Sequence, residues 1–193
     1  MAANPARRAA LADAAVRLLG AEGGRALTHR AVDTAAGVPT GTCANYFPTR
    51  AELMVGLAER IFTLLAPDAS RLAELAAVEE GDAAPAYLAH VVERLLAHPH
   101  LATALVELRL EAARTPAVAA RLAPFLQAGL DDDVAFHTAR GLPGGRETVV
   151  LLHHVAQGIV LDALTVPLDP ACDPREVAQE AARRLVRADG HRR

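Results

Sequence analysis

The chain has 193 residues, which is enough for one large domain or two small ones. Hydrophobic residues make up 52% of it and aromatic residues only 3%, and the apolar content is mainly Ala, Leu and Val, of which Ala and Leu are strong helix formers. Two distant cysteines give no disulfide framework. The chain shows neither a signal-peptide core nor a long uncharged apolar run. The sequence therefore predicts an all-α protein of the cytoplasm with no membrane association.

The net charge of −3 is unevenly distributed along the chain. Residues 1–65 carry seven arginines and five acidic residues, whereas the remainder carries thirteen arginines and eighteen acidic residues. A basic head on an acidic body is the asymmetry expected of a nucleic-acid-binding protein. The asymmetry is modest, and ordinary scatter explains it equally well on charge alone.

Two short helices separated by a glycine turn are predicted near the N-terminus. Thr28 is the residue type of an N-cap for a helix over about residues 29–36. Gly37 tolerates the left-handed conformation that a tight turn needs. Pro39 suits the first turn of the next helix, which ends near Tyr46. Such an arrangement, with a flanking helix on each side, predicts a helix-turn-helix.

The rest of the chain is predicted to be helical as well, with about nine to ten helices in all. The pattern Thr49-Arg50-Ala51-Glu52 matches a capping box that opens a helix to about Leu65. We expect a DNA-binding domain over residues 5–50 with a linking helix to about 65, and a larger helical domain over 66–190. The other predicted helices span about residues 5–21, 82–97, 99–114, 116–140, 146–166 and 174–187, with a short one after Asp68.

The segment from residue 40 to residue 50 carries side chains suited to DNA. Gly41 allows the backbone to approach the major groove closely, and short hydroxyl and amide side chains reach base edges and phosphates. A tyrosine hydroxyl and an arginine near a helix start add phosphate contacts. A solvated surface helix has a similar composition, so spacing alone leaves both interpretations open. The candidate residues are Thr40, Thr42, Asn45, Tyr46 and Arg50.

A longer motif covers about the first third of the chain. It consists of Leu27-Thr28-His29-Arg30-Ala31-Val32, Ala35-Ala36-Gly37-Val38, Gly41-Thr42, Asn45-Tyr46-Phe47-Pro48-Thr49-Arg50 and Leu53. This motif resembles the DNA-binding domain of the TetR family of transcriptional regulators. The resemblance implies phosphate contacts from Thr28, Tyr46 and Arg50, and base or phosphate contacts from Arg30, Thr40, Thr42 and Asn45. It also implies a small core of Val32, Ala36, Val38 and Phe47.

Three positions depart from the family pattern. Pro39 stands where a cap such as Ser is usual, which removes one phosphate contact, and Ala44 replaces a common aromatic residue. Asp33 replaces a small residue and is expected to act as a local cap or hydrogen-bond acceptor, not as a DNA contact. The helix face that contacts the bases therefore offers fewer DNA-contacting side chains than is usual in the family.

The almost continuously apolar helix over residues 146–166 predicts a dimer. A helix that is apolar on all sides is buried on all sides, and a symmetric partner is the simplest cover for its outer side. The resemblance also implies a dimer that places two reader helices one DNA turn apart, roughly 34–36 Å, on a palindromic operator. The candidate interface residues are Val149, Leu152, His153, Ala156 and Val160.

The resemblance further implies a small effector, bound between the body helices, that weakens DNA binding. Polar residues on the apolar helices are the candidates for binding it: Glu107, Glu111, His153, His154 and Gln157. A solvated face is the simpler explanation for the two glutamates, and a satisfied core histidine is the simpler role for one of the histidines. The scarcity of buried charge favours an apolar or amphipathic effector.

The sequence thus predicts a ligand-responsive DNA-binding regulator, a repressor in the family's usual mode, with no cofactor or metal. His98-Pro99-His100 lacks metal-ligand spacing, and no nucleophile motif supports an enzyme. Cys43 is expected to be a small buried residue, although a redox role for Cys43 or Cys172 stays open. A helical protein-interaction module without DNA binding is the alternative function.

Overall fold

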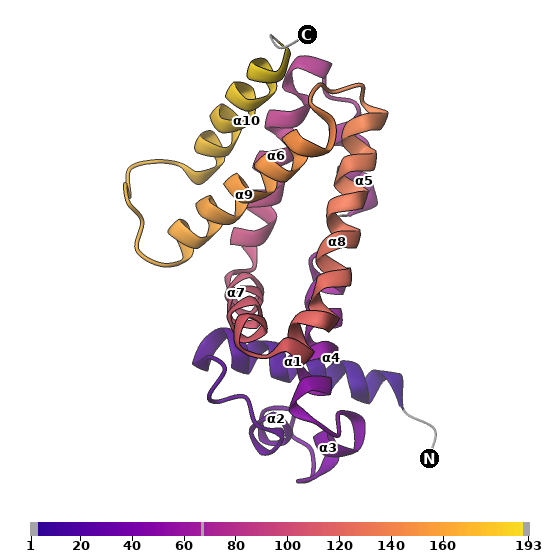
Figure 1. Ribbon diagram of the computed structural model, residues 1–193. Coiled ribbons are helices and arrows are strands. Elements are labelled where there is room, and N and C mark those ends of the chain that lie inside the picture. The colour runs from indigo at the N-terminus through magenta and orange to yellow at the C-terminus, as the bar shows by residue number, and fades with distance from the viewer. Residues whose placement is uncertain (1–3, 67, 191–193) are drawn as a thin grey trace. The chain divides into compact units, whose positions relative to one another are not determined.

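The computed structural model describes residues 4–66 and 68–190, which form ten α-helices and no strand (Figure 1). The all-α prediction is confirmed. The helices are α1 (Pro5–Glu22), α2 (His29–Ala35), α3 (Thr42–Tyr46), α4 (Arg50–Leu64), α5 (Ala69–Ala76), α6 (Glu80–Ala97), α7 (Pro99–Arg114), α8 (Pro116–Ala139), α9 (Gly145–Leu164) and α10 (Pro174–Gly190).

Side-chain caps open several of the helices, among them α1, α2, α4 and α5. The capping box that opens α4 is present, since Thr49 Oγ1 accepts from Glu52 N at 3.1 Å and Glu52 Oε2 accepts from Thr49 N at 2.9 Å. The predicted start of the third helix near Pro39 is wrong, because α3 begins at Thr42. Gly41 has a φ of 92°, a left-handed conformation that interrupts the helix between Pro39 and Thr42.

The chain divides into two compact units. The first unit contains the described residues up to Ala66 together with His98–Phe125, and the second contains those from 68 to Ala97 and from Leu126 to 190. Helix α7 and the first part of α8 therefore pack with the N-terminal helices. The sequence-based division into residues 5–50 and 66–190 stays a prediction.

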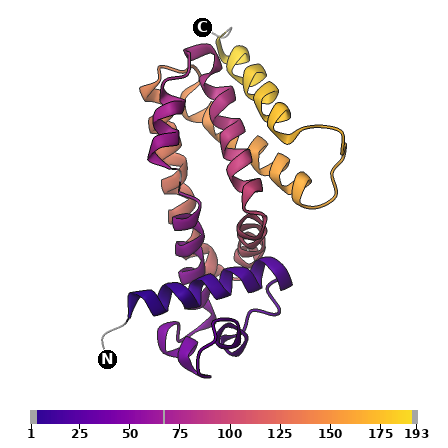
Figure 2. The ribbon, with the colours of Figure 1, turned by 180° about the vertical axis from the view of Figure 1, so that it is seen from behind.

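Helix α1 organises the first unit by packing against α7, α4 and α2 (Figure 2). Its inward residues Leu11, Ala15 and Leu19 are fully buried. Gly20 allows the closest approach, since a Cβ atom there would overlap the backbone carbonyl group of His100 in α7. Small residues on α1 thus determine how closely α7 packs.

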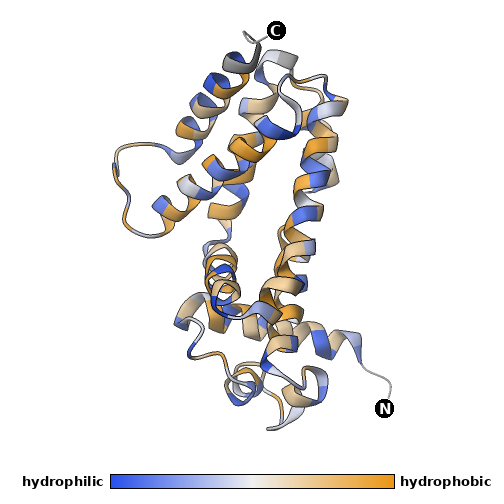
Figure 3. Ribbon diagram, in the orientation of Figure 1, coloured by the Kyte–Doolittle hydropathy of each residue, from blue (hydrophilic) through white to orange (hydrophobic). Residues whose placement is uncertain are grey.

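The second unit is built on α6, which packs against α10, α9 and α5. Small buried residues, including Ala89 in α6 and Ala182 in α10, allow these helices to approach closely. Arg140, directly after α8, donates to the carbonyl oxygens of Ala76 and Val78, which ties the end of α8 to the end of α5. Helix α9 has the length and composition of a membrane span. Its buried face packs within this unit, and Figure 3 shows hydrophilic turns along it.

Candidate DNA-binding site and ligand cavity

Helices α2 and α3 and the turn between them present most of the predicted DNA-contacting residues to solvent. Thr28 also caps α2, because its Oγ1 accepts from Ala31 N at 3.1 Å. Thr42 and Tyr46 are half-buried, and the Thr42 hydroxyl donates to Pro39 O at 2.6 Å. The exposed members of the set are Thr28, Arg30, Thr40, Asn45 and Arg50.

The carboxylate of Asp33 holds the start of α3 against α2. Asp33 is only 2% exposed, and its Oδ2 accepts from Gly41 N at 2.7 Å while its Oδ1 accepts from Cys43 N at 2.6 Å. Backbone N–H groups at a helix start have no partner within the helix. The prediction that Asp33 is a local hydrogen-bond acceptor is confirmed.

The end of α3 is fixed by Phe47. His29 Nε2 donates to Phe47 O at 2.6 Å, and the buried Phe47 ring lies against Gly56 in α4, where a Cβ atom would overlap it. The Arg8 guanidinium lies 4.9 Å from the centroid of the same ring. Of the predicted small core, Phe47 and Val32 are buried, whereas Ala36 and Val38 are half-buried.

Arg50 is bound by the protein's own carbonyl groups. Its Nη1 donates to Leu27 O at 2.6 Å and its Nη2 donates to Gly24 O at 2.8 Å. Its Nε lies 3.7 Å from Glu111 Oε1, yet the side chain is 44% exposed. Arg50 therefore ties the start of α4 to the loop before α2, and its phosphate contact stays a prediction.

Glu107 and Glu111, predicted to bind an effector, lie in the first unit. They line a polar surface groove beside the loop that follows α1, together with Glu22, Arg25 and Arg114. Charged side chains of both signs line this groove, and the two glutamates are half-buried: the Glu111 side chain is 17% exposed and lies 3.7 Å from Arg50 and 3.6 Å from Arg114. The simpler interpretation of a fully solvated face therefore does not describe Glu111.

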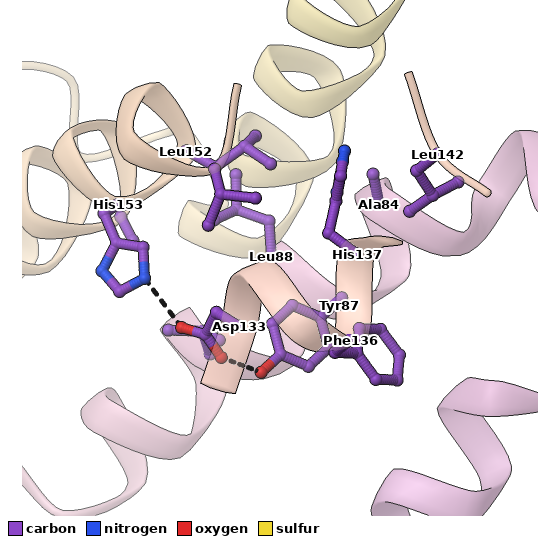
Figure 4. Close-up of a pocket in the computed structure, with 12 residues that line it drawn as sticks. Ala84, Tyr87, Leu88, Asp133, Phe136, His137, Leu142, Leu152 and His153 are labelled. Atoms are coloured by element: carbon purple, nitrogen blue, oxygen red, sulfur yellow. Dashed lines mark hydrogen bonds and ion pairs between the residues drawn. The ribbon is translucent and has the colours of Figure 1, made fainter. Parts of the chain in front are cut away.

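The second unit contains a cavity of about 40 Å³ between α6, α8 and α9 (Figure 4). Tyr87 and Phe136 contribute stacked rings whose centroids are 4.7 Å apart. His153, one of the predicted ligand residues, also lines the cavity. The remaining lining is mainly apolar and includes Leu88, Val91, Leu142, Val149, Leu152 and Ala156.

Asp133 lies at the centre of the polar groups in this cavity. Its Oδ1 accepts from the Tyr87 hydroxyl, and its Oδ2 accepts from His153 Nε2 at 2.7 Å (Figure 4). Burial raises the pKa of Tyr87, and the adjacent Asp133 carboxylate raises it further, so the phenol keeps its proton and donates. His137 is buried and donates to Pro143 O at 2.8 Å.

The predicted ligand residues do not converge on one site. His153 reaches the cavity, whereas His154 and Gln157 are exposed on α9. Neighbouring residues on a helix point about 100° apart, so His153 and His154 cannot face the same site. Sequence reasoning missed Tyr87 and Asp133. Asp133 ends a run of three aspartates, and nothing in that run indicates which carboxylate faces inward.

Four of the five residues of the predicted dimer interface pack against their own chain, and the fifth, His153, is half-buried and lines the cavity, so the interface itself stays a prediction. Val149, Leu152, Ala156 and Val160 are between 4% and 8% exposed and pack into the core of their own chain. They form one face of α9 at positions i, i+3, i+7 and i+11, so they leave little surface for a partner. The exposed apolar residues of α9 lie elsewhere on the helix: Leu151 is 47% exposed and Leu161 is 46% exposed.

Comparison with known proteins gives a consistent family. Residues 79–188 match the family profile described as the tetracyclin repressor-like C-terminal domain. No curated protein matches the chain.

Solved structures match nearly the whole chain. The multidrug binding protein EbrR complexed with imidazole is 30% identical, and the match covers 94% of this chain and 90% of that one with a TM-score of 0.69. EbrR complexed with ethidium is 29% identical over 93% and 98% of the two chains, with a TM-score of 0.68. SCO1917 from Streptomyces coelicolor A3, described as a member of the TetR family, is 28% identical over 94% and 98%, with a TM-score of 0.69.

Proposed function

Since the chain belongs to the TetR family of transcriptional regulators, we propose that it is a repressor released from a palindromic operator by a small molecule. The observation that carries this proposal is the α2–turn–α3 segment, which presents Arg30, Thr40 and Asn45 to solvent on a turn held by Asp33. This α2–turn–α3 segment, called the reader below, is held in place before it meets DNA, so it loses little conformational freedom on binding.

The reader makes two kinds of contact in this proposal. Thr28, Tyr46 and Arg30 contact phosphates, which position the protein, and Thr40 and Asn45 contact base edges, which supply specificity. Thr42 contributes less, because its hydroxyl already donates to Pro39 O.

The DNA-binding proposal is tested by fluorescence anisotropy with DNA from upstream of the gene. We expect Arg30→Ala to weaken DNA binding about tenfold. It should also reduce by about 1 the slope of the logarithm of the binding constant against the logarithm of the salt concentration, because one phosphate contact fewer releases fewer counterions. Arg121→Ala is the matched control, since Arg121 is also an exposed arginine but lies in α8. The absence of any binding at low salt would favour a protein-interaction module instead.

We further propose that the exposed residues of α9 and α10 form a homodimer interface. Leu151, Leu161 and Val177 are each more than 40% exposed, which is unfavourable for large apolar side chains in contact with water. TetR-family regulators dimerise, and two-fold symmetry would repeat the reader on both half-sites.

The dimer proposal is tested by light scattering after size-exclusion chromatography. Leu161→Glu is expected to convert the dimer to a monomer, because it buries an unpaired charge in the interface. Leu110→Glu is the control, because Leu110 in α7 is 48% exposed but lies outside the proposed interface. A dimer that survives Leu161→Glu unchanged contradicts the choice of face.

The effector is proposed to bind in the cavity of the second unit. EbrR has been crystallised with ethidium and with proflavin, which are planar aromatic molecules. The stacked rings of Tyr87 and Phe136 and the apolar lining suit a molecule of this shape. Release of operator DNA by ethidium, followed by gel shift, tests the proposal, and Leu152→Arg should abolish the release by filling the cavity.

A further inference from the structure

We propose that the cavity of the second unit selects organic cations, with Asp133 as the counter-charge, and that the bound cation replaces His153 at the Asp133 carboxylate. This inference rests on the proposed function, because it names the charge of the effector. It also assigns His153 the role of a closing contact that is broken on binding.

The charge of the lining is the first observation. Asp133 is the only Asp, Glu, Lys or Arg among the twelve lining residues. The Tyr87 hydroxyl and His153 Nε2 both donate to its carboxylate, and such donors stabilise the anion. A carboxylate inside an apolar lining attracts a cation more strongly than a carboxylate in water, because the local dielectric constant is lower.

The aromatic rings add a second attraction for a cation. Tyr87 contacts both Asp133, through its hydroxyl, and the ring of Phe136, by stacking (Figure 4). A delocalised cation beside Asp133 would therefore meet ring faces, which favour positive charge. A neutral aromatic molecule would gain the stacking alone.

The size of the cavity shows that a bound ligand must displace side chains. About 40 Å³ holds little more than one water molecule, whereas sites for drug-sized ligands enclose several hundred cubic ångströms. The side chain of His153 is 35% exposed and that of Asp133 is 23% exposed, so the solvent-facing side of the pair is the histidine. Movement of His153 both opens the cavity and frees an oxygen of Asp133.

Within the described part of the chain, the other charged groups nearby make no direct contact with Asp133, although the charge of Arg94 on α6 acts on it electrostatically. Asp131 is exposed and pairs with Arg146 at 2.7 Å, and Asp132 is exposed. Arg94 on α6 does not line the cavity, and its Nε has no hydrogen-bond partner among the described residues, but its charge interacts electrostatically with Asp133 and Tyr87. The Asp133 carboxylate is therefore not neutralised at contact distance by an arginine.

The experiment compares N-methylacridinium, a permanent cation, with acridine, a neutral molecule of the same ring size at neutral to alkaline pH. Fluorescence titration of the full-length wild-type protein should show about tenfold tighter binding of the cation, the gain of one charge-assisted contact. Asp133→Asn should weaken binding of the cation about tenfold and change acridine binding by less than about twofold. Asp132→Asn, on the same helix but exposed, should change neither by more than about twofold.

Each result decides a different point. Equal binding of the two probes by the wild-type protein overturns the cation selectivity, and this comparison needs no variant to fold. Equal loss of both probes in Asp133→Asn, with the wild-type circular dichroism spectrum retained, overturns the role of Asp133. If neither probe binds while the operator still does, the cation proposal fails but DNA binding stands. Failure of the operator to bind refutes the proposed function, whatever the titration shows.

Discussion

Removal of the Asp33 carboxylate should loosen the DNA-reading helix and destabilise the first unit. In Asp33→Ala, the amides of Gly41 and Cys43 lose acceptors at 2.7 and 2.6 Å. A hydrogen bond to a charged group contributes about 1.5–3 kcal/mol, and the cost is larger for a donor left buried. Gly41 is exposed, so water replaces its acceptor, whereas Cys43 is fully buried. The expected loss is about 3 kcal/mol of unfolding free energy.

Urea denaturation followed by circular dichroism measures that loss, and a melting temperature lower by roughly 10 °C should accompany it. Thr34→Ala is the matched control, because Thr34 is the neighbouring residue on α2 but is exposed, and its hydroxyl donates to Arg30 O within the same helix. Operator binding by Asp33→Ala should fall more than its stability alone requires, because α3 no longer starts from a fixed position. A loss below about 1 kcal/mol would refute the reasoning, since it would mean that the two amides find other acceptors.

Three further predictions concern packing and charge. Gly20→Ala should destabilise the protein by about 2 kcal/mol in thermal melts, because the new Cβ atom overlaps the backbone of α7. The control is Gly129→Ala on α8, where the Cβ atom meets open space and the change should be neutral or slightly stabilising. Equal melting temperatures of the two variants would contradict this prediction. Burial, reinforced by the charge of Asp33, raises the pKa of the Cys43 thiol to about 11, so Ellman's reagent at neutral pH should react only with the exposed Cys172. That reaction should be slower than with a free thiol, because the hydrogen bond to Asp169 raises the pKa of Cys172 as well, and two reactive thiols per folded chain would be inconsistent with the structure. Arg50→Gln should lower the unfolding free energy by about 1–2 kcal/mol through the lost bonds to the loop before α2, and an unchanged urea midpoint would argue against that tie.

Local signals in the sequence predicted the elements well. Pro99 and Pro116 mark the first residues of α7 and α8, and the capping box at Thr49 opens α4 as expected. These signals act within a few residues, so they need no tertiary information. The start of α3 was predicted wrongly at Pro39 because this local signal does not report the backbone angles of the residues that follow it. Gly41 adopts a left-handed conformation, so the helix begins only at Thr42.

Tertiary relations were beyond the sequence. The apolar face of α9 was recognisable, but the surface that it packs against was not: Val149 and Leu152 pack within their own chain, whereas Leu151 and Leu161 are exposed. Likewise, nothing local links Tyr87 to Asp133, which are 46 positions apart and meet only when α6 packs near α8. Such a pair is a property of the packed helices, not of either helix alone.

The small volume of the cavity in the second unit also bears on the concentration at which the proposed regulator responds. If only a fraction of the molecules has an open cavity, the apparent dissociation constant is the intrinsic constant divided by that fraction. Core substitutions that loosen α9 outside the cavity lining, such as Val160→Ala, would raise this fraction at the expense of folding stability. Two regulators with identical ligand contacts and identical operators could then respond at different effector concentrations, solely because the core of one is packed more tightly. Selection for sensitivity would act on buried leucines and alanines that touch neither DNA nor the rest of the regulatory machinery.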